Sequence, residues 1–356
     1  CTGRLSTSNY ERTKRIMAYT TINKSTEHFN TKLWPGTGSS PNALTGVGFK
    51  PDWTWIKSKS TASHFLYDSI RGVSKYLLAD DTGAEGTNGY LSSFDTDGIT
   101  LGSTSINVNA SGTNYASWNW KANGTSSVNY SGTVDSTVSV NTTSGFSIVS
   151  WIHNGNANYT VGHGLGATPR MIFAKTRSSS ANWDVYQAEL STGNRLILNS
   201  TGGQVSGYWG ANTVNNNTFS VGSALASNGT TMIAYCFAEK QGFSKTAVYT
   251  GNGSATNGTF VYTGFKPAFV MIKHYTGGGN DWIIKDNKSP GSNVTTKILF
   301  PNADYSEGNG AYIDLLSNGF KLRNNEGNSN DDGTVYLYLA FGQTLVGTNN
   351  IPNNAF

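Results

Sequence analysis

Apolar side chains occur along this chain in short runs that are separated by polar, glycine-rich segments. In one run, Trp53 and Trp55 share a face of an extended strand, while Thr54 and Ile56 occupy the opposite face. Residues 269–272 are apolar on both faces, which predicts a strand at the centre of a sheet that is covered on both sides. The pattern fits short β-strands joined by tight turns better than it fits long helices.

One phrase occurs three times, at residues 48–57, 166–175 and 264–273. Each copy begins with glycine, has proline three residues later, continues as an apolar strand and ends on lysine. Glycine permits unusual backbone angles and proline cannot donate to a ladder of hydrogen bonds, so we expect the strand to begin just after the proline. The closing lysines are expected at solvated strand ends: Lys57, Lys175 and Lys273.

Three further features recur with the phrase. An aromatic residue follows each proline at a nearly constant distance: Phe65, Trp183 and Trp282. Each copy then closes on an apolar strand, at residues 115–120, 231–237 and 336–341. A strand-like stretch opens each copy, at residues 32–36, 128–132 and 247–251. So regular a recurrence indicates an internal repeat.

The repeat is about 100 residues long, which suits a β-sandwich of seven or more short strands. Polar linkers at residues 121–127 and 239–242 separate the copies, and their shortness indicates domains that are held close together. We therefore predict an all-β fold of three tandem β-sandwich domains, of jelly-roll or lectin-like type. The predicted domains are residues 17–122, residues 123–240, and residues 241–356 with a C-terminal tail.

The composition agrees with this fold class and excludes several others. Only 13% of the 356 residues are charged, against roughly 25% in an average globular chain. The two cysteines, Cys1 and Cys236, cannot form a disulfide framework, and no cysteine or histidine cluster has the spacing of a metal site. No apolar run approaches the ~20 residues of a membrane span, so membrane insertion is not expected.

The positive charge of the chain is concentrated at its start. The whole sequence carries a net charge of +4, and residues 1–16 contribute +3 through four basic residues and one acidic residue. Residues 17–356 therefore keep only +1, which removes the main support for a nucleic-acid partner. We interpret residues 1–16 as a basic leader, and whether it belongs to the native protein stays open.

The segment around Asp95 and Asp97 fits either a calcium loop or a hairpin turn. The third copy has Asn318-Gly319 where the first has Asp97-Gly98, and both dipeptides favour a two-residue hairpin turn. A single turn also offers too few oxygen atoms for Ca²⁺. We therefore predict a hairpin at each place and no metal site.

Two acidic clusters raise the question of a glycosidase, which needs two carboxylates held close together, one of them with a raised pKa. The clusters are Asp80-Asp81 with Glu85, and Glu326 with Asp331-Asp332. Both lie among glycine, asparagine and threonine, as turn residues do. The five histidines are scattered and have no nucleophile in a suitable motif. The sequence therefore predicts no catalytic residues, no metal and no cofactor.

Aromatic residues are the remaining candidates for a binding site, because their faces suit sugar rings. Those that recur in all three copies are expected to pack inside the fold. Trp209 and Tyr275 do not recur, and each is expected on a loop of a single copy. We predict these two residues as ligand-binding residues.

Several motifs together resemble one protein family. They are residues 17–24, 29–33 and 48–57, Asp68 with Arg71-Gly72, and residues 93–98, 116–122 and 341–352. From Met17 onward, the chain resembles repeat-containing structural proteins in the virions of marine tailed bacteriophages, especially cyanophages and pelagiphages. The resemblance implies a virion component of tail-fibre, knob or capsid-appendage type, and it carries over no site residue.

The expected function is therefore that of a non-enzymatic virion structural protein. Its expected partners are further copies of itself, other virion proteins and a host-surface glycan. Two alternatives stay open: a tailspike that degrades polysaccharide, and a secreted, extracellular bacterial adhesin of lectin-like type. Acids gathered on one concave face would favour the enzyme, whereas acids scattered over turns would remove that alternative.

Overall fold

The computed structural model describes residues 18–207, 209, 213–289 and 293–346. Within these ranges the chain forms antiparallel β-sheets and one short 3-10 helix, η1 (Ser25–Glu27), so the predicted all-β class is confirmed. In the same ranges, no helix has the length and apolar character needed to cross a membrane. The predicted basic leader, residues 1–16, lies outside the described residues.

The first group of strands, called unit 1, contains a six-stranded sheet in the order β1-β9-β3-β4-β5-β6 and a three-stranded sheet in the order β2-β8-β7. Its strands are β1 (Phe29–Pro35), β2 (Asn42–Leu44), β3 (Trp53–Ser58), β4 (His64–Asp68), β5 (Lys75–Leu78), β6 (Gly86–Thr87), β7 (Leu91–Asp95), β8 (Gly98–Leu101) and β9 (Asn114–Trp120). The predicted hairpin at Asp97-Gly98 joins β7 to β8, with Asp95 opposite Gly98.

The second group, unit 2, contains an eight-stranded sheet in the order β10-β11-β12-β19-β14-β15-β16-β17, and a pair, β13-β18. Its strands are β10 (Ser127–Asn129), β11 (Ser136–Asn141), β12 (Phe146–Ile152), β13 (Tyr159–Gly162), β14 (Met171–Thr176), β15 (Asp184–Gln187), β16 (Asn194–Ile197), β17 (Val205–Ser206), β18 (Thr218–Val221) and β19 (Thr231–Phe237). It follows unit 1 in the chain.

The third group, unit 3, contains two four-stranded sheets, in the orders β20-β27-β22-β23 and β21-β26-β25-β24. Its strands are β20 (Ser244–Thr250), β21 (Phe260–Tyr262), β22 (Lys266–His274), β23 (Ile283–Asp286), β24 (Thr295–Ile298), β25 (Gly308–Leu316), β26 (Gly319–Leu322) and β27 (Val335–Gln343). The second predicted hairpin joins β25 to β26, with Leu316 opposite Gly319.

The three units share one order of three neighbouring strands in one of their sheets. In each unit the closing strand lies between an opening strand and the strand formed by the repeated phrase, which we call the phrase strand. The orders are β1-β9-β3, β12-β19-β14 and β20-β27-β22. The opening strand expected at residues 128–132 is therefore wrong as a counterpart of the other two. That stretch overlaps β10, which pairs with β11 at the sheet edge, and β12 takes the place beside the closing strand.

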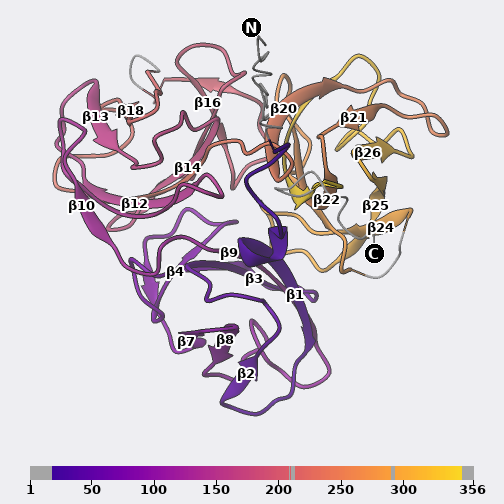
Figure 1. Cartoon of the computed structure of the whole chain (residues 1–356), viewed down its shortest axis with the longest axis horizontal. Coiled ribbons are helices and arrows are strands. Elements are labelled where there is room, and N and C mark those ends of the chain that lie inside the picture. The colour runs from indigo at the N-terminus through magenta and orange to yellow at the C-terminus, as the bar shows by residue number, and fades with distance from the viewer. Residues whose placement is uncertain (1–17, 208, 210–212, 290–292, 347–356) are drawn as a thin grey trace, which may run out of the picture.

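The three units surround one shared hydrophobic core (Figure 1). Aromatic rings cross every boundary: Trp53 stacks on Tyr235 at 4.2 Å, Phe29 stacks on Phe341 at 5.1 Å, and Phe237 lies 5.7 Å from Phe341. The opposite face of each phrase strand packs into a core of its own unit, through Ile56, Ile172 and Val270. Burial on both faces explains why these strands lack the alternation of a solvent-exposed sheet.

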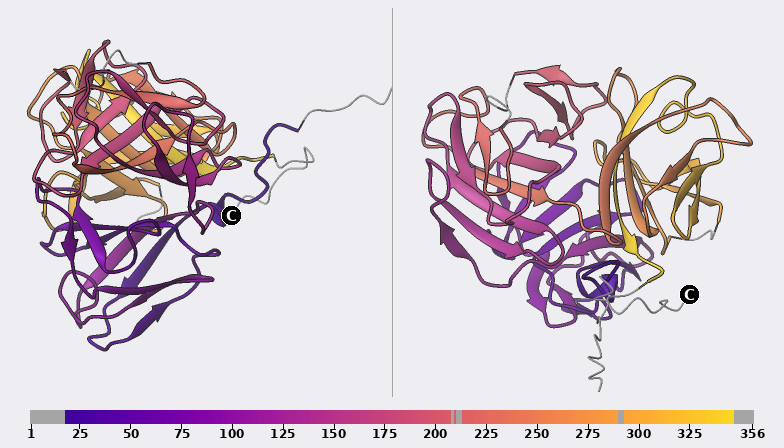
Figure 2. Two further views of the ribbon diagram at one scale, coloured as in Figure 1. Left: turned by 90° about the vertical axis from the view of Figure 1, so that its left-hand side faces the viewer. Right: turned by 45° about the horizontal axis from the view of Figure 1, so that its top comes forward.

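The described chain starts and ends on the same side of the molecule (Figure 2). The side-chain carbonyl of Gln343 accepts a hydrogen bond of 2.7 Å from the backbone N–H of Ser25. At the boundary between units 2 and 3, Glu239 accepts a bond of 2.8 Å from the N–H of Thr246 in the same manner. Units 3 and 1, which are not consecutive in the chain, are thus joined by a hydrogen bond between the two ends of the described chain.

Candidate functional site

The boundaries between units repeat one backbone contact. We call the boundary of units 1 and 2 junction 1, that of units 2 and 3 junction 2, and that of units 3 and 1 junction 3. At each one, a loop after the phrase strand donates an N–H to a carbonyl of the preceding unit. The bonds are Ala181 to Thr82 at 2.9 Å, Gly279 to Thr201 at 3.1 Å, and Ala62 to Asp304 at 2.8 Å. The three units therefore form a closed ring.

A second backbone hydrogen bond recurs at all three junctions, and at junction 2 its acceptor is the carbonyl of Tyr275. The N–H groups of Glu85, Gln204 and Glu307 each donate a bond of 2.8 Å to the backbone carbonyls of Arg177, Tyr275 and Lys59, respectively. Ion pairs reinforce two of these contacts, Arg177 with Glu85 at 2.8 Å and Lys59 with Glu307 at 2.7 Å. Tyr275 is half-buried, packs against the shared core and serves junction 2. Its backbone role is thus structural, and ligand binding by its ring stays a prediction.

The lysines that end the three copies of the repeated phrase are buried, so the expectation that they lie at solvated strand ends is wrong: Lys57, Lys175 and Lys273. Each ammonium group donates to backbone carbonyls, and the acceptors are Ser58 and Ser60 for Lys57, Thr82 and Ala181 for Lys175, and Thr201 and Asn280 for Lys273. The period of two along a strand puts each lysine on the side of the shared core, where loop carbonyls replace water. Burial lowers the pKa of each lysine to about 8.

These lysines predict a stability that rises with pH. Between a folded-state pKa of about 8 and the ordinary value of 10.5, the unfolded chain binds more protons than the folded chain, so raising the pH favours folding. We expect the free energy of unfolding to increase by about 1 kcal/mol for each of these lysines between pH 7 and pH 9. Lys285, whose pKa burial lowers to about 7, acts in the same direction. Urea unfolding followed by circular dichroism at both pH values measures the change.

The matched variants are Lys175→Met and Lys245→Met. The first removes one buried ammonium and should reduce the slope, whereas the second removes a cation from an exposed hydrogen bond and should leave the slope unchanged. Above the ordinary lysine pKa of 10.5 the trend reverses, because burial raises the pKa values of Cys236 and Tyr235 and the unfolded chain loses those protons first. A flat or falling profile from pH 7 to 9 would contradict the assignment.

Strand register identifies the counterpart of Trp183 and Trp282 as His64, and not as the expected Phe65. Phe65 pairs with Ile56, while Trp183 and Trp282 each stand one residue before the equivalent partner strand. Their indole N–H groups donate across junctions 1 and 2, to Leu78 at 2.7 Å and to Ile197 at 3.0 Å. Burial lowers the pKa of His64 well below its usual range, so its imidazole is neutral.

One fully buried ion pair lies in unit 1 beside junction 1, and its hydrogen bonds to Tyr235 cross that junction. Arg71 pairs with Asp68, donates to the Leu66 carbonyl at 2.8 Å and reaches the Tyr235 hydroxyl of unit 2 at 3.2 Å. That hydroxyl donates to Asp68 at 2.8 Å. Burial opposes the charged guanidinium, but the attraction of Asp68 and of neighbouring groups raises the Arg71 pKa overall. The pair lies in the core, so it positions the two units against each other.

In the acidic clusters, Asp80, Glu85 and Glu326 accept hydrogen bonds from the backbone or form an ion pair. Asp80 accepts a bond of 2.9 Å from the N–H of His64, Glu85 pairs with Arg177, and Glu326 accepts a bond of 2.6 Å from the N–H of Ala311. Asp97 accepts bonds from two glycine N–H groups, and these bonds lower its pKa. No group of three metal-ligating side chains occurs within the described ranges.

Trp209 is fully buried, so its ring presents no face to a ligand in this conformation. It packs edge-on against Tyr186 at 5.8 Å and Phe219 at 6.1 Å, inside the core of unit 2. A tryptophan that does not recur fills space created by this unit's own loop. The sequence could not distinguish that role from an exposed platform, because both roles fall on a loop.

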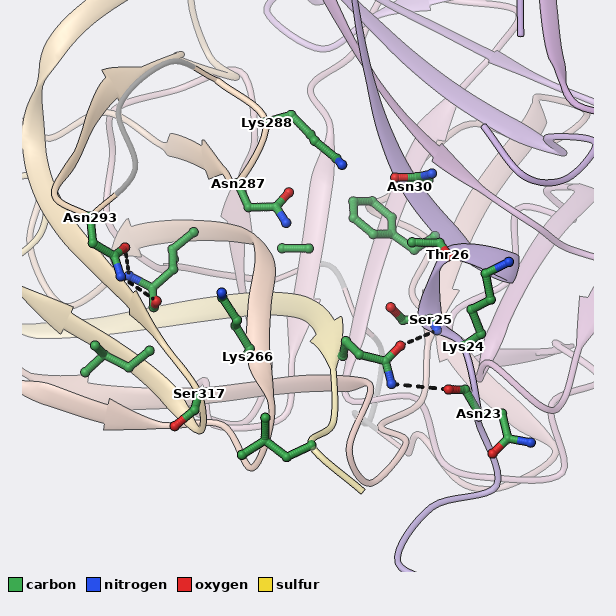
Figure 3. A pocket seen from close by; sticks show the side chains of 16 residues that line it. Asn23, Lys24, Ser25, Thr26, Asn30, Lys266, Asn287, Lys288, Asn293 and Ser317 are labelled. Carbon is green, nitrogen blue, oxygen red and sulfur yellow. Dashed lines mark hydrogen bonds between the residues drawn. The ribbon is translucent and has the colours of Figure 1, made fainter. Parts of the chain in front are cut away.

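The described chain contains a cavity of about 710 Å³ at junction 3, which the sequence analysis missed (Figure 3). One wall comes from the segment that enters unit 1, and the other from unit 3. The cavity is lined by Asn23, Lys24, Ser25, Thr26, Phe29, Asn30, Lys266, Ala268, Asn287, Lys288, Asn293, Leu315, Leu316, Ser317, Gln343 and Leu345. Its mixture of ammonium groups, amides and apolar side chains makes it the candidate functional site.

The residue after the phrase proline distinguishes junction 3 from the other two. At junction 1 this residue is Asp52, whose carboxylate accepts bonds from the N–H groups of Ala122 at 2.7 Å and Gly124 at 3.1 Å. At junction 2 it is Arg170, which pairs with Glu189 and lies near Glu239. At junction 3 it is Ala268, whose methyl group leaves the space open. This one difference between copies was the sequence signal for the cavity.

Comparison with known proteins gives a family and no function. A search of the curated proteins and a search of the solved structures each found no match. A family model described as a domain of unknown function (DUF7483) matches residues 24–344, a range that contains all three units and all but two of the residues that line the cavity. The chain therefore belongs to the DUF7483 family.

Proposed function

We propose that this protein is a non-enzymatic structural component of a bacteriophage virion, of tail-fibre, knob or capsid-appendage type. In this role it assembles with further copies of itself and with other virion proteins, and it contacts a host-surface glycan. The observation that carries the proposal is the ring of three units, which one chain closes through repeated backbone bonds and a shared aromatic core. A ring of this kind suits a part that must keep its shape while exposed outside a cell.

The use of the ionisable residues supports a structural role over a catalytic one. Lys175 and Lys273 donate hydrogen bonds to backbone carbonyls across junctions 1 and 2. Glu85 and Glu307 form ion pairs across junctions 1 and 3. The two acidic clusters lie in different units, near junction 1 and in unit 3. A polysaccharide-degrading tailspike would need two such acids to face one bound sugar chain.

Location in the particle tests the proposal directly. Particles released from cells that produce this protein are purified on a density gradient and analysed by mass spectrometry and by gold-labelled antibody. We expect peptides from residues 24–344 in the particle fraction and gold on the particle surface. Production of the protein in the cells together with its absence from washed particles would overturn the virion assignment.

Incubation with envelope polysaccharide tests the non-enzymatic part of the proposal. We expect no release of reducing ends above that from heat-denatured protein, because Asp80, Glu85 and Glu326 are engaged by backbone N–H groups or by an arginine. Release that persists in Glu85→Gln and Glu326→Gln would place the catalytic acids elsewhere, and any release would overturn the non-enzymatic assignment. The same preparations are checked by circular dichroism.

A further inference from the structure

We propose that the junction 3 cavity binds an acidic sugar unit of a surface polysaccharide, through its carboxylate and its hydroxyl groups. This inference rests on the proposed contact with a glycan and specifies where and with what chemistry that contact is made. The cavity volume of about 710 Å³ lies within the range of small-molecule sites, which runs from roughly 300 to 1,000 Å³.

The charge around the cavity favours an anion. Three lysines line it, Lys24, Lys266 and Lys288, and no carboxylate contributes to the part of the lining that the structure describes. Lys266 and Lys288 both come from unit 3; Lys288 extends toward Asn30, whereas the ammonium group of Lys266 points toward the side of the cavity where Asn293 lies (Figure 3). A carboxylate on a sugar would therefore meet ammonium groups from one wall of the cavity and polar groups from the other.

The remaining lining favours a sugar over an alkyl chain. Asn287 and Lys288 are exposed next to the partly buried Ala268, and further amides and hydroxyls follow around the cavity. Three amides of the lining already form hydrogen bonds within the chain: Asn30, Asn293 and Gln343. The exposed amide of Asn287 can donate to and accept from sugar hydroxyls, which an alkyl chain cannot offer. Leu345, which is exposed, and the half-buried Leu316 supply apolar surface for the C–H face of a sugar ring. An acidic sugar is the ligand class that uses all three kinds of surface.

The repeat itself shows that this space can be filled by protein. Asp52 and Arg170 occupy the corresponding positions at junctions 1 and 2 and form internal bonds there. Ala268 leaves the position empty only at junction 3, where lysines surround it. Ala268→Asp should restore a carboxylate at this position, pair it with the nearby lysines and exclude an anionic ligand.

Isothermal titration calorimetry on the full chain tests the inference with cellobiouronic acid, a disaccharide of glucuronic acid and glucose. Its neutral analogue cellobiose differs only in the carboxylate and should bind about tenfold more weakly. Lys266→Gln and Lys288→Gln should each weaken binding of the acid by about tenfold, and Ala268→Asp should abolish it. Laurate, an anion with an alkyl tail, should not compete.

Lys50→Gln is the matched control, because Lys50 holds the same place in the first phrase that Lys266 holds in the third, and both are exposed. It should bind cellobiouronic acid as the unaltered chain does. Equal binding of cellobiose, competition by laurate, or no binding up to about 10 mM would each overturn the inference. None of these outcomes affects detection of the protein in particles, and absence from particles would leave the calorimetric result intact.

Discussion

Replacing Arg71 by methionine is expected to destabilise the fold by about 3–5 kcal/mol, because the change leaves the carboxylate of Asp68 buried without its cation. Both side chains are completely shielded from solvent, and the guanidinium also bonds the Leu66 carbonyl and the Tyr235 hydroxyl. Unpaired charge in a low-dielectric core cannot be compensated by water. Urea unfolding at pH 7, followed by circular dichroism, measures the loss.

Two control variants distinguish the effect of removing a buried charge from the effect of removing an exposed one. Arg170→Met removes an arginine whose ion pair with Glu189 is about one third exposed, so we expect a cost of about 1 kcal/mol or less. The double variant Asp68→Leu with Arg71→Met removes both charges and should recover much of the loss, because no charge is then left unpaired. An Arg71→Met chain within 1 kcal/mol of the unaltered chain would contradict the assignment of a buried pair.

The sequence predicted those parts of the fold that depend on local chemistry. Both hairpins occur where Asp97-Gly98 and Asn318-Gly319 predict them. In each one the glycine is already the first residue of the second strand, so the two-residue loops are Thr96-Asp97 and Ser317-Asn318. The phrase strands are central, as their apolar character on two faces predicts. These features depend on neighbours in the sequence, which a repeat makes easy to recognise.

The lysines show where local reasoning failed. A lysine at the end of an apolar strand is usually solvated, and nothing near Lys175 in the sequence indicates that the backbone carbonyl of Thr82, in another unit, accepts a hydrogen bond from its ammonium group. The ring closure could not be predicted for the same reason, because Ser25 and Gln343 meet only after all three units have folded. The cavity forms between two units that meet only when the ring closes. The role of Ala268 in leaving this space open could therefore not be predicted from its neighbours in the sequence.

Trp53→Ala is expected to cost about 3–5 kcal/mol and to weaken the whole ring, although Trp53 belongs to unit 1. Its ring stacks on Tyr235 at 4.2 Å and lies 5.8 Å from Phe146 and 6.0 Å from Phe237, all in unit 2. The cavity left by the indole would therefore open between two units. Urea unfolding measured by far-ultraviolet circular dichroism and by light scattering should shift as one transition.

Trp53→Phe is the matched control for shape, because it keeps an aromatic ring and removes an indole N–H that has no hydrogen-bond partner in the structure. We expect it to cost less than about 1.5 kcal/mol. If the units instead folded independently, Trp53→Ala would shift only part of the unfolding signal and leave the remainder at its original urea concentration. The shared core makes the single transition the expected result, since no unit can lose its inner face without exposing that of its neighbours.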